Sequence, residues 1–218
     1  MLILSCIVTA LIAYLLGSIP TGYLMGRARG IDLRTMGSGN IGATNAFRIL
    51  GKPAGIFVLI VDGLKGWVSV ELIPGVVCKL LHVSSDADMS EYLAMIAGVF
   101  AILGHNYTCW LKFKGGKGIA TSAGVLAALI PVAFVVGLTT WIVVCLLTKY
   151  VSLASMAAAF SLPFAAWAGH SSRRLIAVAA ILGALAIYKH KANIERLRKG
   201  TENKIGGKKA PPATGAGS

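Results

Sequence analysis

The sequence predicts an all-α, polytopic integral membrane protein with about seven transmembrane helices, its N-terminus outside the cell and its C-terminus in the cytoplasm. Hydrophobic residues make up 56% of the 218 residues, and the mean hydropathy is +0.75. Charged residues account for only 13% of the chain, about half the share of an ordinary soluble domain. This composition excludes a soluble enzyme and a disordered chain. The four cysteines lie scattered in apolar segments without a CxxC pair, which excludes a disulfide-stapled module.

The first expected helix lies in residues 1–26, which contain no charged residue. The segment is long enough to cross a bilayer, which takes about 20 apolar residues. No basic stretch precedes its apolar core, so we expect a retained helix rather than a cleaved signal peptide. The remaining helices are expected in the apolar stretches 53–78, 92–111, 118–148, 151–169 and 175–188.

The distribution of Lys and Arg predicts on which side the connections lie. Basic residues gather in 27–52, in 112–117 and from 189 onward, whereas the connection 80–91 carries three acidic residues. Cytoplasmic connections of membrane proteins are enriched in Lys and Arg. The three basic segments are therefore expected to share the cytoplasmic face.

Residues 118–148 form an uncharged run of 31 residues. One helix of that length would extend about 46 Å, more than a hydrocarbon layer of about 30 Å requires. Pro131 interrupts the run, and either two helices of about 15 residues each or a re-entrant hairpin would return the basic C-terminal segment to the cytoplasm. We expect one helical membrane domain over residues 1–209 and a disordered tail over 210–218, which contains only Pro, Gly, Ala, Thr and Ser.

Residues 37–48 (GSGNIGATNAFR) combine small residues with neutral hydrogen-bond donors and one arginine. Small residues let backbone amides approach an anion closely, and a guanidinium can bind phosphate through two parallel hydrogen bonds. The spacing is not that of a P-loop, and the segment alone would indicate only a tight turn. The candidate phosphate ligands here are Ser38, Gly39, Asn40, Asn45 and Arg48.

Residues 104–122 contain GHNY followed by FKGGKGIATS. A lysine flanked by glycines meets a phosphate with little steric hindrance, and the helix that follows can present its N-terminal amides to the same anion. The candidate ligands here are Gly115, Gly116, Lys117 and Gly118. His105 on its own is typical of an interfacial histidine with a satisfied hydrogen bond.

Residues 189–202 (KHKANIERLRKGTE) form a basic segment after the last apolar stretch, which by itself indicates only orientation and binding of anionic lipid. On a helix, however, His190 and Asn193 lie on one stripe and can point into one site. Asp62 and Lys65 also lie three apart, inside an apolar helix. We interpret them as a structural pair that neutralises itself rather than as a proton relay.

Taken in order, these three segments closely resemble the motifs of the bacterial acyl-phosphate:glycerol-3-phosphate acyltransferase family, PlsY. The resemblance covers nearly the whole chain, although Thr108 and Cys109 depart from the expected pattern. It implies transfer of a fatty acyl group from acyl phosphate to the 1-hydroxyl of glycerol 3-phosphate, giving lysophosphatidic acid and inorganic phosphate. It also implies a location in the bacterial inner membrane, with the active site on the cytoplasmic side, and neither cofactor nor metal.

The resemblance implies that the candidate phosphate ligands named above are the family's phosphate-binding residues. It adds His190 and Asn193 as catalytic residues and His105, Arg196 and Glu202 as supporting residues. An acyl phosphate is a mixed anhydride with a good leaving group, so a covalent acyl-enzyme is unnecessary. We expect Asn193 to orient the acceptor or polarise the carbonyl, and His190 to position the hydroxyl. Whether His190 or a substrate phosphate accepts the proton stays open.

A small transporter or flippase for phosphorylated compounds is the competing class, and a lipid-bound scaffold is a third. Transporters bind their cargo near the midplane between inverted repeats, whereas the candidate ligands here gather at one face. The positive charge is divided between apolar segments, so no nucleic-acid partner is expected. Membrane lipid is an expected partner, and we expect the chain to function as a monomer.

Overall fold

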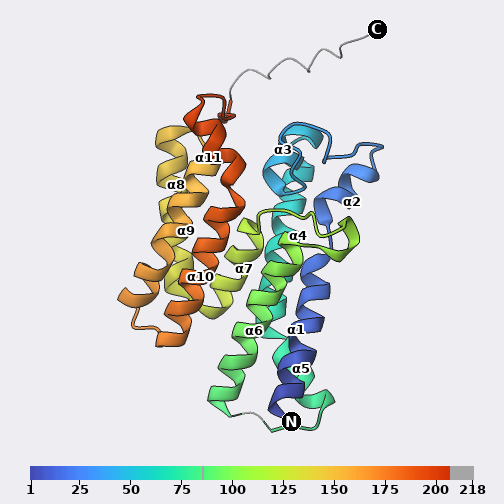
Figure 1. Cartoon of the computed structure of the whole chain (residues 1–218), viewed down its shortest axis with the longest axis vertical. Coiled ribbons are helices and arrows are strands. Elements are labelled where there is room, and N and C mark those ends of the chain that lie inside the picture. Colours follow the sequence, from blue (N-terminus) through green and yellow to red (C-terminus); the bar gives the residue numbers. More distant parts are fainter. Residues whose placement is uncertain (85, 207–218) are drawn as a thin grey trace.

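The computed structural model describes residues 1–84 and 86–206, and every regular element in these ranges is a helix (Figure 1). In chain order the elements are α1 (Leu2–Ser18), α2 (Thr21–Arg27), α3 (Ala43–Leu50), α4 (Lys52–Glu71), α5 (Ile73–Leu80), α6 (Ala87–Asn106), the 3-10 helix η1 (Cys109–Leu111), α7 (Ile119–Leu129), α8 (Pro131–Thr148), α9 (Val151–Ala168), α10 (Arg173–Lys189) and α11 (Lys191–Arg198). The predicted all-helical membrane class is confirmed.

Three of the expected apolar segments are each divided into two helices beside a proline. Pro20 separates α1 from α2, Pro74 lies in the first turn of α5, and Pro131 begins α8. A proline lacks the amide hydrogen that the preceding turn needs, so a helix starts at it more readily than it continues through it. The run 118–148 becomes an 11-residue α7 and an 18-residue α8, not two helices of equal length.

The helices form two groups with α7 between them (Figure 1). Helices α1, α4, α5 and α6 pack on one side, and α8, α9 and α10 pack on the other. Helices α2, α3 and α11 lie at one end of the bundle, whereas the N-terminus lies at the opposite end. The first and third motif segments therefore share one end of the molecule, and the connection from α6 to α7, which carries the second, lies nearer the middle of the long axis.

Glycines let α7 approach α4 at backbone contact. A Cβ added at Gly66 would overlap the carbonyl oxygen of Thr121, and one added at Gly124 would overlap that of Gly63. Two helices with larger residues at these positions would have to move apart. The close contact fixes α7, and with it the glycine-rich loop that precedes it, against the first helix group.

Five segments are long and apolar enough to cross a bilayer, and α10 with α11, which meet at 54°, make a sixth candidate if taken together. The five are Leu2–Arg27, Lys52–Glu71, Ala87–Leu111, Pro131–Thr148 and Val151–Ala168. Helix α7 is shorter than these. The number of crossings and the side on which the motifs lie therefore stay predictions. The expected disordered tail, 210–218, lies outside the described residues.

Candidate active site

A cavity of about 310 Å³ extends from the end of the bundle that carries α3 and α11 into the space between α7, α8 and α9. A second, more polar cavity of about 180 Å³ adjoins it. The two share Ser38, Asn40, Lys117 and Asn193 in their walls. They therefore form one connected site with a polar mouth.

Every site residue that the sequence predicts lines at least one of these cavities. The larger is lined by Ser38, Asn40, Asn45, Arg48, His105, Lys117, Gly118, His190, Asn193 and Glu202. The smaller adds Gly39, Gly115, Gly116 and Arg196. Segments far apart in the sequence are thus brought to one place.

Two asparagines of the first segment hold its loop together. Asn45 Oδ1 accepts a hydrogen bond from the backbone amide of Ser38 (3.0 Å), and Asn45 Nδ2 donates to two carbonyls earlier in the loop (3.2 and 3.0 Å). Asn40 Oδ1 accepts from the amide two residues on (2.8 Å). These amide groups shape the loop before α3. The Ser38 hydroxyl and the Arg48 guanidinium are among the polar side-chain groups that this loop and α3 offer a phosphate.

The connection between α6 and α7 carries Lys117 into both cavities. The backbone amide of Gly116 donates to the carbonyl of His105 (3.0 Å), and the amide of Gly115 donates to the next carbonyl of α6 (3.2 Å). The loop therefore folds back onto the end of α6. Gly118 then adopts a φ of +79°, a conformation open to glycine but costly for other residues, and directs the chain into α7.

A hydrogen-bond network joins the second and third segments. Lys117 Nζ donates to Asn193 Oδ1 (2.6 Å), and Asn193 Nδ2 donates to Glu202 Oε1 (2.8 Å). Arg196 Nε donates to Glu202 Oε2 (2.7 Å), and Ser152 Oγ of α9 donates to Oε1 of the same carboxylate (2.9 Å). Glu202 thus fixes three side chains, and Asn193 fixes the ammonium of Lys117.

The site carries a surplus of positive charge. Burial, together with the charges of Arg196 and Arg48, lowers the pKa of Lys117 to about 8, against the opposing attraction of Glu202. Burial raises the pKa of Glu202, but the hydrogen bonds that it accepts outweigh this and hold its pKa below the usual value. Glu202 is paired with Arg196, whereas Arg48 has no ion-pair partner among residues 1–84 and 86–206. An anionic ligand would relieve this repulsion.

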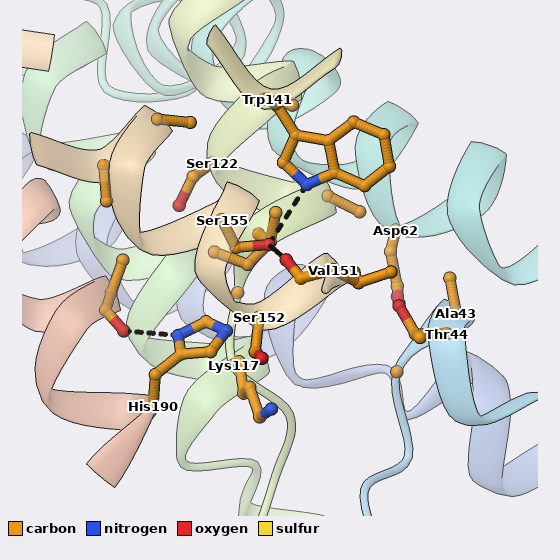
Figure 2. Close-up of a pocket in the computed structure, with 18 of the residues that line it drawn as sticks. Ala43, Thr44, Asp62, Lys117, Ser122, Trp141, Val151, Ser152, Ser155 and His190 are labelled. Carbon is orange, nitrogen blue, oxygen red and sulfur yellow. Dashed lines mark hydrogen bonds between the residues drawn. The ribbon is translucent and has the colours of Figure 1, made fainter. Parts of the chain in front are cut away.

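His190 presents one ring nitrogen to the cavity. Its Nδ1 lies 2.8 Å from the carbonyl oxygen of Ala186, and because a carbonyl can only accept, Nδ1 carries the hydrogen. The free Nε2 is therefore an acceptor, and Figure 2 shows it on the cavity side of the ring. Burial and the nearby Lys117 ammonium lower the pKa of His190 to about 4, so the imidazole is neutral near pH 7.

Several lining residues had no site role in the sequence interpretation. Lys189 lines the smaller cavity, and its Nζ donates to the carbonyl of Asn106 (3.1 Å) and lies 4.3 Å from the ring centre of Tyr107. Its position next to His190, within a basic segment, is the sequence feature that could have indicated a site role for Lys189. Ser152 and Asp62 also line the larger cavity. Nothing in the sequence around Ser152 indicates this, whereas Asp62, a charge inside an apolar helix, was interpreted only as the structural partner of Lys65.

Beyond the cations the cavity wall becomes apolar. Trp141 Nε1 donates to Ser155 Oγ (3.1 Å), which itself donates to the carbonyl of Val151 (2.8 Å), so the polar atoms here are satisfied (Figure 2). The deeper wall is formed by Leu126, Ala133, Phe134, Gly137, Leu138, Ala158, Ala159, Leu162 and Leu182. In the described ranges, no group of three His, Cys, Asp or Glu side chains could hold a metal ion. The cavity suits a molecule with an anionic head and an apolar chain.

Residues 7–200 match the family model of glycerol-3-phosphate acyltransferase. The chain is 46% identical over 191 residues to the glycerol-3-phosphate acyltransferase of Geotalea daltonii, a match that covers 88% of this chain and 93% of the relative. It is 44% identical over 195 residues to that of Fusobacterium nucleatum, covering 89% of this chain and 95% of the relative.

The fold is similar to crystal structures of PlsY (YgiH), an integral membrane glycerol 3-phosphate acyltransferase. Its glycerol 3-phosphate form gives a TM-score of 0.81 at 36% identity and covers 92% of this chain and 96% of that chain. Its lysophosphatidic acid form gives 0.78 at 35% identity and covers 92% and 95%.

Proposed function

The chain belongs to the glycerol-3-phosphate acyltransferase family, and from this premise we propose that its acyl donor is an acyl phosphate. The 1-hydroxyl of glycerol 3-phosphate receives the fatty acyl group, and the products are lysophosphatidic acid and inorganic phosphate. We place the reaction on the cytoplasmic side of the bacterial inner membrane and assign it to the monomer, without a cofactor.

The observation that carries this proposal is a single cavity that is cationic at its mouth and apolar beyond. An acyl phosphate has the same division, a dianionic head on an alkyl chain. Glycerol 3-phosphate has the head without the chain, which suits the adjoining polar cavity around Lys117 and Arg196. The two substrates can then meet at the shared wall of the cavities.

The reaction needs positioning more than activation. The acceptor hydroxyl oxygen attacks the carbonyl carbon of the mixed anhydride, the bond from that carbon to the phosphate oxygen breaks, and phosphate leaves. Arg48 and Lys117 offset the repulsion between two phosphate groups held close together. Alignment of bound reactants can supply about 7 to 11 kcal/mol of a barrier.

The hydroxyl proton goes to a substrate phosphate in our proposal. A histidine whose pKa is about 4 is a weaker base near pH 7 than a phosphate, whose second pKa is about 6. His190 Nε2 instead accepts a hydrogen bond from the neighbouring 2-hydroxyl of glycerol 3-phosphate, which orients the 1-hydroxyl and leaves its hydrogen free for the phosphate. Asn193 Oδ1 accepts from Lys117 and Asn193 Nδ2 donates to Glu202, so we assign Asn193 to holding Lys117.

The test is turnover by the purified protein in detergent with palmitoyl phosphate and labelled glycerol 3-phosphate. We expect lysophosphatidic acid and inorganic phosphate in equal amounts, and no product from palmitoyl-CoA. Lys117→Ala should lower turnover by about 100-fold or more, whereas Lys114→Ala, in the exposed part of the same loop, should retain it. Turnover in detergent excludes a pure transporter, and product from palmitoyl-CoA alone would overturn the assigned donor.

A further inference from the structure

A buried charged cluster lies beside the site and is not used by the mechanism above. Asp62 and Lys65 of α4 have side chains only 2% and 4% exposed, and their Oδ1 and Nζ atoms are 2.7 Å apart. Thr21 Oγ1 donates to the same Oδ1 (3.0 Å), and Lys65 Nζ also donates to the carbonyl of Ile19 (2.9 Å). The pair therefore ties α4 to the break between α1 and α2.

A third ionisable side chain reaches the pair from α6. His105 Nδ1 lies 3.6 Å from Asp62 Oδ1, and the His105 side chain is 6% exposed. This distance exceeds a hydrogen bond, but it brings the carboxylate oxygen into direct contact with the edge of the His105 ring. Asp62 and His105 also line the cavity that contains Lys117. The cluster is thus open toward the site on one side.

The His105 imidazole supports the glycine-rich loop. The backbone carbonyl of His105 accepts the amide of Gly116 at 3.0 Å. The imidazole lies so close to Gly116 that a Cβ added there would overlap the ring. Gly116 is the residue immediately before Lys117, so the position of this ring sets where the Lys117 backbone lies.

We propose that Asp62, Lys65 and His105 form a positioning cluster that holds the Gly116–Lys117 backbone where the ammonium can bind phosphate. Asp62 fixes the ring of His105, the ring and carbonyl of His105 fix Gly116, and Lys65 neutralises Asp62 so that the carboxylate does not attract the Lys117 ammonium. The proposal rests on the assigned role of Lys117 as a phosphate ligand.

A purely structural ion pair does not account for this arrangement. Replacing both members of a buried pair with well-packed hydrophobic residues of similar volume is often neutral or stabilising. Asp62 and Lys65 could therefore be replaced together at little cost if their only task were to neutralise each other. The Asp62 carboxylate also contacts His105, and this contact sets the orientation of a ring that the loop packs against.

The first experiment separates these two roles with the Asp62→Leu/Lys65→Met double variant, which replaces the pair with hydrophobic residues of similar volume and keeps the charge balance. If the cluster positions the loop, we expect kcat/KM of this double variant for glycerol 3-phosphate to fall about 10-fold or more. Its melting temperature should stay within a few degrees of wild type. Turnover equal to wild type would overturn the proposal. Asp32→Asn/Arg34→Gln removes an exposed pair of similar geometry and should leave turnover unchanged.

The second experiment links His105 to Lys117. His105→Gln should raise KM for glycerol 3-phosphate about 10-fold or more, with a smaller change in kcat, because the ammonium is misplaced. The more hydrated Lys117 should also move the basic limb of the kcat/KM profile upward from about pH 8. His170→Asn, at an exposed histidine, is the matched control. An unchanged KM together with an unchanged limb overturns the proposal.

A conservative substitution provides the rescue. Thr21→Val removes the hydroxyl that Asp62 accepts and should lower kcat/KM, whereas Thr21→Ser keeps the hydroxyl and should restore it. Equal losses in both variants would show a packing effect and overturn the role of the hydroxyl in the cluster. Turnover of palmitoyl phosphate by wild type, measured beside these variants, distinguishes a failure of the proposed function from a failure of the positioning cluster. If wild type is active and the variants match it, the positioning cluster fails while the proposed function stands.

Discussion

The pH dependence of glycerol 3-phosphate use reports directly on the burial of Lys117. The ammonium carries its charge below its pKa and loses the charge as the pH rises through it. With a pKa of about 8, the protonated fraction falls from about nine-tenths at pH 7 to about one-tenth at pH 9. We therefore expect kcat/KM to fall about 10-fold across this interval. A lysine at its ordinary value of 10.5 would lose only a few per cent.

The assay measures kcat/KM for glycerol 3-phosphate between pH 6 and 10 at palmitoyl phosphate concentrations far below saturation, so that the free enzyme predominates, with non-enzymatic hydrolysis subtracted. This parameter reports groups of the free enzyme, and a substrate phosphate with a second pKa of about 6 is fully ionised above pH 7. His190, whose pKa is about 4, stays neutral throughout. Lys117→Arg should remove the basic limb, because arginine keeps its charge over this whole pH range.

Two results would refute this reasoning. A flat wild-type profile up to pH 10 would mean that Lys117 is solvated or does not need its charge. The same limb in wild type and in Lys117→Arg would assign the titration to another group. Should the arginine variant be too slow to measure, the pH dependence of glycerol 3-phosphate binding to wild type decides, since loss of the ammonium must weaken binding over the same interval.

Two further predictions concern the ends of the site. Glu202→Gln weakens hydrogen bonds that hold Asn193, and at about 1.5 to 3 kcal/mol for a bond to a charged group kcat/KM should fall about 10- to 150-fold. Glu195→Gln, at an exposed carboxylate, is the control, and equal activity of the two variants would contradict the role of Glu202. Gly137→Leu fills the apolar part of the cavity, so the ratio of palmitoyl to octanoyl phosphate turnover should fall about 10-fold or more, by analogy with other pocket-filling changes. Val136→Leu, outside the cavity wall, should keep that ratio, and an unchanged ratio in Gly137→Leu would place the acyl chain elsewhere.

The gathering of the three motif segments could be predicted because each signal behind it is local. Glycine and basic residues occur together within short segments, and the charge pattern assigns these segments to one face. Pro131 likewise predicted a break in the run 118–148. The unequal lengths of α7 and α8 were not predictable from the proline alone, because Pro131 begins α8 and α7 takes only the residues between the loop and this point.

Contacts between distant helices were the part that sequence could not supply. The spacing of Asp62 and Lys65 predicted their pairing, which the structure shows, but the approach of His105 depends on α4 and α6 lying side by side. Ser152 is a single hydroxyl in an apolar helix, and its bond to Glu202 leaves no local pattern. Asn45 matched a phosphate-binding composition, yet its side chain is hydrogen-bonded within its own loop.

The short α7 explains where the chemistry can take place. Its 11 residues extend about 16 Å, and Figure 1 shows the connection from α6 to α7 lying deeper along the long axis than α3 and α11. In the proposed donor, an acyl phosphate, the reacting carbonyl lies between a phosphate and an alkyl chain, so we expect it where the cationic mouth of the cavity meets its apolar part. A full-length helix would carry Lys117 out to the end of the bundle, away from this boundary. The recessed loop keeps Lys117 at the boundary, and the cost of this placement is the burial that lowers the pKa of Lys117.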